Sequence, residues 1–151
     1  MIIQAGFDFE ILARPFIVQG GKLMPRLVLI CVDAEMRLSS VDVVAEDFSG
    51  SLAPFRDAVL VALDAEYTRY FAIAHPGRFS EYHCSDPIMV EARALESEAA
   101  DRGMQLIGHF AIDETGYMSA RACSYFDQYP GNDDLPRTMF HWSHSRLGQC
   151  G

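Results

Sequence analysis

The residues around His75 form the part of this sequence best suited to chemistry. His75 follows the apolar run Ala72-Ile73-Ala74 and precedes Pro76-Gly77, which is typical of the end of a buried strand. Asp86 comes eleven residues later, just before Pro87, a residue favoured in the first turn of a helix. A histidine nitrogen and a carboxylate oxygen that meet in this way can ligate zinc. The alternative is an exposed loop histidine and a helix-capping aspartate.

His83 adds a third metal-ligating side chain, because it lies three residues before Asp86 in the connecting loop. Glu81 and Cys84 lie beside it. The residue types therefore allow a metal site of His75, His83 and Asp86, with zinc as the cofactor. Cys84 is also a candidate nucleophile beside a histidine base. Loops of this composition are more often solvated than ligating, so a polar surface loop remains the competing interpretation.

Two further segments carry groups of interest. His109 lies in the predicted strand Leu106 to Ile112, on the face shared with Ile107 and Ala111, where we expect a half-buried histidine with a hydrogen-bond partner. Ser49-Gly50-Ser51 precedes a predicted helix and could bind an anion through its backbone amides. No lysine follows in P-loop register, so we expect no nucleotide site.

The elements that must position these residues follow from the apolar patterning. Predicted strands cover Leu27 to Val32, Leu38 to Phe48, Tyr70 to Ala74, Leu106 to Ile112 and Tyr117 to Ala122. The first predicted helix begins at Ser51 and has an apolar stripe from Phe55 to Tyr67. The second begins at Ser85 or Asp86 and ends at Gly103. Asp113 to Gly116 is a predicted hairpin turn. This order predicts an α/β fold in which helices cover one mixed sheet.

The two ends of the chain lack the regular strand and helix patterns of the centre. Residues 1–25 hold two apolar patches interrupted by Pro15 and Gly20-Gly21, and we interpret them as an extended N-terminal arm or an edge hairpin. Residues 26–122 are the predicted domain. Residues 123–151 are predicted to be an irregular tail, which we expect to pack on the domain or to serve as an interface through its aromatic anchors Tyr125, Phe126, Phe140 and Trp142.

Composition narrows the function classes. The chain has 151 residues, enough for one domain. Its net charge is −9 and its only lysine is Lys22, which argues against nucleic acid as a partner. No apolar run approaches the ~20 residues of a membrane span, and no signal peptide is evident, so we expect a soluble, cytoplasmic protein. The four cysteines form no CxxC pair; we expect a reduced, buried Cys31 and no disulfides.

Several of these segments together resemble a known family. They are Gly50-Ser51-Leu52, Phe55-Arg56-Asp57, Ala74-His75-Pro76-Gly77, Asp86, Leu106-Ile107-Gly108-His109 and Gly116-Tyr117-Met118-Ser119. In this order and spacing, the pattern resembles the RadC-like branch of the JAB/MPN domains across residues 26–122. The resemblance implies a mixed sheet flanked by helices, a cytidine-deaminase-like sandwich. Active members of that family are zinc metallohydrolases that cut peptide or isopeptide bonds, so the resemblance also implies this chemistry as the family's activity.

The sequence departs from the family pattern at the positions that carry its chemistry. The family motif is His-x-His, seven residues, Ser, two residues and Asp, with a glutamate base from an earlier strand. His75 and Asp86 match the second His and the Asp, whereas Ile73 and His83 occupy the first His and the Ser positions. The glutamate falls near Pro25. A nitrogen ligand and the general base are therefore missing.

These observations leave three hypotheses. The first is a RadC-like JAB/MPN domain that has lost catalysis and acts as a binding or scaffold module for a protein or peptide partner. The second is a zinc-dependent metallohydrolase, of peptidase or isopeptidase type, with a rearranged site at His75, His83 and Asp86. The third is an unrelated small α/β protein. The sequence does not specify the partner or the oligomeric state.

Overall fold

The computed structural model describes residues 1–4, 6–64, 67–77 and 86–119. Along these residues the chain forms α1 (Gly6–Ile17), β1 (Val18–Gln19), β2 (Lys22–Leu23), β3 (Leu27–Val32), β4 (Leu38–Ala45), the 3-10 helix η1 (Ala53–Phe55), α2 (Arg56–Leu63), β5 (Tyr70–Pro76), α3 (Pro87–Asp101), β6 (Gln105–Ile112) and β7 (Tyr117–Ser119). From β3 onwards this is the predicted order of strands and helices.

The described residues build a five-stranded sheet in the order β4-β3-β5-β6-β7. β3 pairs antiparallel with both β4 and β5, β5 pairs parallel with β6, and β6 pairs antiparallel with β7. The parallel pair is joined by the α3 crossover, as parallel strands require. The fold is therefore α/β with a mixed sheet flanked by helices, which confirms the predicted class.

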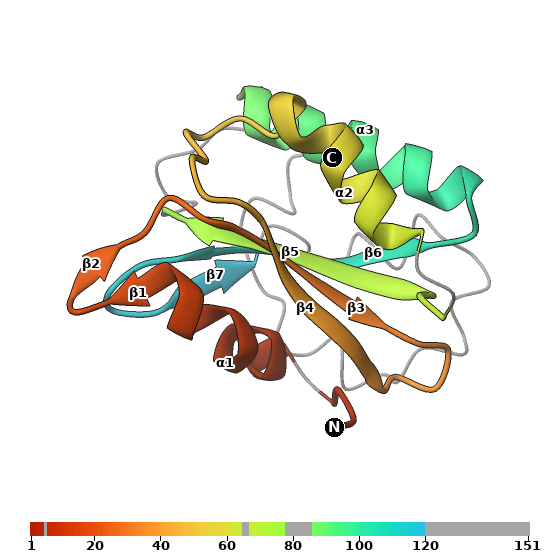
Figure 1. The fold of residues 1–151 in the computed structure, drawn as a ribbon, viewed down its shortest axis with the longest axis horizontal. Helices are drawn as coiled ribbons and strands as arrows, with labels where there is room; N and C mark the ends of the chain where they lie inside the picture. The colour runs from red at the N-terminus through yellow and green to blue at the C-terminus, as the bar shows by residue number, and fades with distance from the viewer. Residues whose placement is uncertain (5, 65–66, 78–85, 120–151) are drawn as a thin grey trace.

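Helices cover both faces of this sheet (Figure 1). α2 and α3 lie on one face, where Leu60, Leu63, Leu95 and Ala99 join a core with Phe71 and other sheet residues. α1 lies on the other face, where Phe9, Ala13 and Ile17 pack with Val28, Ile30 and Phe110. β3 is buried along its whole length, and β5 is buried from Tyr70 to His75. A strand covered on both faces needs apolar residues at every position, which explains the continuous run Leu27 to Val32.

The N-terminal segment is where the prediction was wrong. Residues 6–17 form the helix α1 and not an extended arm. Phe9, Ala13 and Ile17 are fully buried and repeat every fourth residue, which is a helical period. Pro15 lies inside the helix on its exposed side. The expectation gave Pro15 too much weight as a breaker, whereas packing of the apolar stripe on the sheet outweighs the hydrogen bond that proline removes.

The hairpin alternative is confirmed for the next residues. β1 and β2 pair antiparallel, with Gln19 opposite Lys22. Gly20 and Gly21 occupy the two turn positions with φ of 59° and 76°. Positive φ at both central residues is the requirement of a type I′ turn, which glycine meets without steric cost.

Two smaller expectations are also corrected. Ile107 was placed on the same face as His109, but it packs with Phe110 in the core under α1. The reason is a register irregularity between Phe71 and Ala72 in the pairing with β6, which inserts Ile107 as an extra residue and reverses the alternation before it. Tyr67 was assigned to the first helical stripe, but α2 ends at Leu63 and Tyr67 is 71% exposed.

Other predicted boundaries shift by a few residues: β4 ends at Ala45 and not at Phe48, and the first helical turn begins at Ala53 and not at Ser51. Some predicted segments lie outside the described residues. The stripe Ile88, Ala92, Leu95 and Ala99 of α3 is buried as expected. The predicted tail anchors, from Tyr125 to Trp142, are outside the residues that the structure describes. Among the residues that it does describe, no helix combines the length and apolar character that a membrane span requires.

Candidate functional site

His75 lies near the end of β5 and is completely buried. Because side chains alternate along a strand, His75 projects from the same face as Ile73, on the side of the sheet covered by α2 and α3. Its ring centroid lies 4.9 Å from that of Phe48, a residue of the same core. His75 is thus at the end of a buried strand, as predicted, and the alternative of an exposed loop histidine is wrong.

The structure brings His109 to His75. β5 and β6 run parallel with Ile73 opposite His109 and His75 opposite Ala111, so the two histidines are diagonal neighbours on one face. Their Nε2 atoms are 2.7 Å apart and both side chains have no exposed surface. The sequence placed His109 in the correct strand and predicted a hydrogen-bond partner without naming it, but the expectation of a half-buried side chain is wrong because His109 is completely buried. The signal that could have found this partner was the strand–helix–strand order, which makes β5 and β6 parallel neighbours.

The hydrogen bonds of His75 fix its protonation. Its Nδ1 lies 3.0 Å from the carbonyl oxygen of Pro76, and a carbonyl only accepts, so Nδ1 carries the hydrogen. The Nε2 of the neutral ring is then an acceptor, and His109 Nε2 donates to it. Burial lowers the pKa of His75 from 6.5 to about 4, against the smaller opposing effect of the Pro76 hydrogen bond. His75 is therefore neutral at physiological pH.

The other predicted ligands are placed only in part. Asp86 is the N-cap residue of α3, as predicted, but its side chain makes no capping hydrogen bond. Instead its carbonyl oxygen accepts from the backbone of Met89 and Val90. His83, with Glu81 and Cys84, lies outside the described residues. Within the described residues, no group of three or more His, Cys, Asp or Glu side chains is arranged to hold a metal ion.

The described core lacks groups that a catalytic zinc site of the RadC-like type would need. Ile73 is buried in the apolar core and offers no donor atom. Pro25 stands where the glutamate base would fall, and β3, which follows it, is buried and apolar throughout. This part of the structure thus supplies histidine nitrogens but no carboxylate base at that position. It does not fit the family's hydrolytic site.

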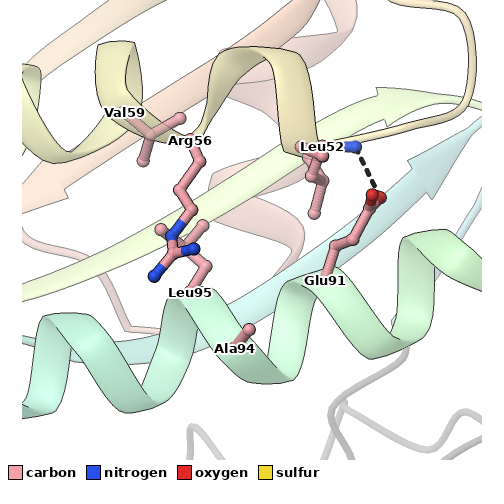
Figure 2. Close-up of a pocket in the computed structure, with 7 residues that line it drawn as sticks. Leu52, Arg56, Val59, Glu91, Ala94 and Leu95 are labelled. Carbon is pink, nitrogen blue, oxygen red and sulfur yellow. Dashed lines mark hydrogen bonds between the residues drawn. The ribbon is translucent and has the colours of Figure 1, made fainter.

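At the end of the segment predicted to bind an anion, the structure places a carboxylate of the protein itself, contacted by the Ser51 side chain and by the amide of Leu52, which follows the segment. The carboxylate of Glu91 accepts hydrogen bonds from the backbone nitrogen of Leu52, at 2.8 Å, and from the hydroxyl of Ser51. Figure 2 shows Glu91 reaching from α3 to Leu52, at the start of η1. This contact ties α3 to the segment before α2.

Beside this contact lies a shallow apolar groove between the two helices. Its lining residues are Leu52, Ala53, Arg56, Val59, Glu91, Ala94 and Leu95, and its volume is about 70 Å³. Small-molecule sites usually measure roughly 300–1,000 Å³, so this groove is too small for a whole metabolite. It matches one aliphatic side chain. Arg56 forms an ion pair with Glu98 at its edge.

No protein-family model and no curated protein sequence matches this chain. The likeness to RadC-like domains therefore stays a prediction from the quoted motifs.

Proposed function

We propose that the protein is a RadC-like JAB/MPN domain that has lost hydrolytic activity and acts as a binding module for a protein or peptide. The observation that carries the proposal is the packing around Ile73 and β3. Where hydrolysis needs a nitrogen ligand and a carboxylate base, this chain has a buried isoleucine and an apolar strand. Without a group to take the proton from a metal-bound water, hydrolysis loses its general base.

The groove between α2 and α3 supports a recognition role. Its size and apolar lining suit one aliphatic side chain of a partner peptide. The net charge of −9 favours partners with basic residues beside that side chain. Glu91, held by Ser51 and Leu52, fixes one wall of the groove before a partner arrives, and a preformed wall lowers the entropic cost of binding.

Two assays on the full chain test this function. In the first, the zinc-supplemented protein is incubated with peptide and isopeptide substrates, and we expect no metal-dependent cleavage. Cleavage that His75→Ala abolishes would favour the rearranged metallohydrolase instead. Dependence of that cleavage on His83 and Asp86 would then identify its predicted ligands.

In the second assay, peptides selected by display on the parent protein are compared for binding to the parent and to two variants, Ala94→Trp and Ser97→Trp. Ala94→Trp fills the groove, whereas Ser97→Trp adds the same ring at an exposed position of α3 outside it. We expect selected peptides to carry an aliphatic residue near basic ones. Their affinity should fall at least tenfold in Ala94→Trp and stay within twofold in Ser97→Trp. Equal binding by all three proteins would place recognition elsewhere.

A further inference from the structure

β4 is an edge strand of the five-stranded sheet and pairs with β3 on one side only (Figure 1). At the start of its outer side, the backbone nitrogen of Leu38 donates to the carbonyl oxygen of Met1, at 2.8 Å, and Ile2 bridges Arg37. Among the described residues, no such backbone partner lies along the outer side of Ser39–Ala45. The chain thus pairs an extended segment with the start of this edge and leaves the rest open to a further strand.

The middle of β4 is regular enough to pair with another extended chain. The register with β3 shifts near both ends of β4, and between the shifts Ser40–Val43 lies opposite Val28–Cys31 without interruption. Lysine, proline and bulges are the usual protection of such an edge. β4 contains no lysine and no proline, and its bulges lie outside Ser40–Val43. Its open backbone groups therefore suit the addition of a short peptide strand.

The two faces of β4 differ in chemistry. Val41 and Val43 are half-buried and pack against the apolar cluster under α1. Asp42 lies between them, so it projects from the opposite face, and its side chain is exposed. Side chains of an added strand alternate in the same way. A matching peptide therefore places every second residue beside the two valines and the others beside Asp42.

α1 supplies an apolar wall on the valine side. Leu12 and Phe16 are half-buried and pack against the same cluster. Both lie about 160° around the helix from Arg14, which reaches the β6–β7 turn near the other edge of the sheet. Leu12 and Phe16 thus face the β4 side, where aliphatic side chains of an added strand can contact them.

The charges along this edge favour a basic partner. The acids near the two ends of β4 are paired, because Glu35 lies 3.2 Å from Arg37 and Glu46 lies 3.7 Å from Arg26. Asp42, between them, has no ion pair among the described residues. A second copy paired over the same residues would bring its own Asp42 close, and like charges across paired strands repel. A lysine or arginine beside Asp42 stabilises the pairing instead.

We propose that the β4 edge binds an extended peptide as a further strand, with aliphatic residues toward α1 and a basic residue beside Asp42. This surface is separate from the groove between α2 and α3, because its residues are different. It is also independent of the RadC-like assignment and of any loss of hydrolysis. Failure of either proposal therefore leaves the other intact.

The first test follows backbone amides of the full chain by NMR hydrogen exchange. The probe is a short acetylated and amidated peptide of alternating valine and lysine, compared with a peptide of the same composition in two blocks. In Ser40–Val43, β3 should protect alternate amides in the free protein, and only the alternating peptide should protect the others. Protection of both sets in the free protein would show that another segment or a second copy already covers the edge, and would overturn the proposal.

The second test exchanges charges. Asp42→Lys should weaken binding of the valine–lysine peptide by about fivefold and strengthen binding of a valine–glutamate peptide. Asp101→Lys, at the exposed end of α3, makes the same change in net charge and should stay within twofold of the parent. Ala94→Trp, which fills the groove, should also stay within twofold. Equal weakening in both lysine variants, or loss of binding in Ala94→Trp, would overturn the proposal.

A third test leaves the protein unaltered, so it remains decisive where a variant fails to fold. The valine–lysine peptide is N-methylated either at its valines or at its lysines, and successive N–H groups of a strand point to opposite sides. Only one set faces β4. One methylated peptide should therefore bind at least tenfold more weakly, because it loses several hydrogen bonds, while the other keeps most of its affinity. Equal affinities of the two methylated peptides would overturn the proposal.

Discussion

His109 lies opposite Ile73 in the parallel strand pair, yet its imidazole hydrogen-bonds to His75, the next residue on the same face of β5. The contact is diagonal across the sheet. It places two polar rings in a layer that is otherwise built from residues such as Ile73, Phe71 and Phe48. Buried polar groups without partners are costly, and here each ring supplies a partner for the other.

This burial predicts a pH-dependent stability. The pKa of His75 is about 4 in the folded protein against 6.5 ordinarily. Because the folded value is the lower one, the unfolded chain binds the proton first as the pH falls. This contribution is complete above about pH 6.5 and declines toward pH 4. Linkage predicts a loss of about 2 kcal/mol in the free energy of unfolding between pH 7 and pH 5.

Urea unfolding of the chelator-treated protein at the two pH values measures this loss. The control is His75→Gln, which removes the titrating ring and should show a smaller pH dependence, with the carboxylates unchanged. An equal dependence in parent and variant would contradict the assignment to His75.

Gly108 is expected to tolerate no side chain. A Cβ at this position would lie 2.4 Å from Cε2 of Phe110 and 3.3 Å from Cβ of Ala72. Phe110 is completely buried, so its ring cannot move away freely. We expect Gly108→Ala to lower the free energy of unfolding by about 1–3 kcal/mol. Gly116→Ala, whose Cβ would meet nothing within 4 Å, is the matched control. Equal stability of the two variants in denaturant would show that the β6 core adapts.

Glu91 is expected to stabilise the protein far more than its neighbour on α3, Glu98. Glu91→Ala leaves the backbone nitrogen of Leu52 and the hydroxyl of Ser51 without their acceptor. We expect this variant to lower the free energy of unfolding by about 1–3 kcal/mol. Glu98→Ala breaks the partly exposed ion pair with Arg56, where the loss should stay below about 1 kcal/mol. Chemical denaturation of both variants gives the comparison, and a larger loss in Glu98→Ala would refute it.

Asp113 is expected to hold the turn between β6 and β7. Its Oδ1 accepts from the backbone nitrogens of Thr115 and Gly116 and from the hydroxyl of Thr115. Asp113→Ala should cost about 1–2 kcal/mol of stability, and Asp113→Asn, which keeps an acceptor oxygen, should cost less. Hydrogen exchange at the β6 and β7 amides would locate the effect. Unchanged protection in Asp113→Ala would mean that strand pairing alone fixes the turn.

The sequence predicted the central sheet well because its strands are short apolar runs bounded by strong turn signals. The continuous apolar run from Leu27 to Val32 is stable as a strand only if both faces of the sheet are covered there. α1 was missed because its signal, three buried residues four apart, is brief and contains Pro15. Local patterns also cannot count an inserted strand residue, so the register irregularity at Ile107 was invisible.

The sequence predicted which residues the candidate site contains better than it predicted which of them contact one another. His75 and Asp86 were placed correctly on their elements. The partner of His75, however, is 34 residues away in sequence, and only the pairing of β5 with β6 brings His109 to it. Reasoning from sequence spacing predicts partners within the same loop, such as His83. In a sheet, the partners of a residue lie on the neighbouring strands, which can be far away in sequence.

The contact between Arg14 and the β6–β7 turn has a consequence for how the chain is made. The guanidinium of Arg14, on α1, donates to the carbonyl oxygens of Asp113 and Gly116, at sequence separations of 99 and 102 residues. A ribosome adds about 5–20 residues per second. The first helix must therefore wait roughly 5–20 s for the last described hairpin. During that interval Phe9, Ala13 and Ile17 can reach the apolar residues of β3 and β5 but lack the part of their sheet surface that β6 contributes.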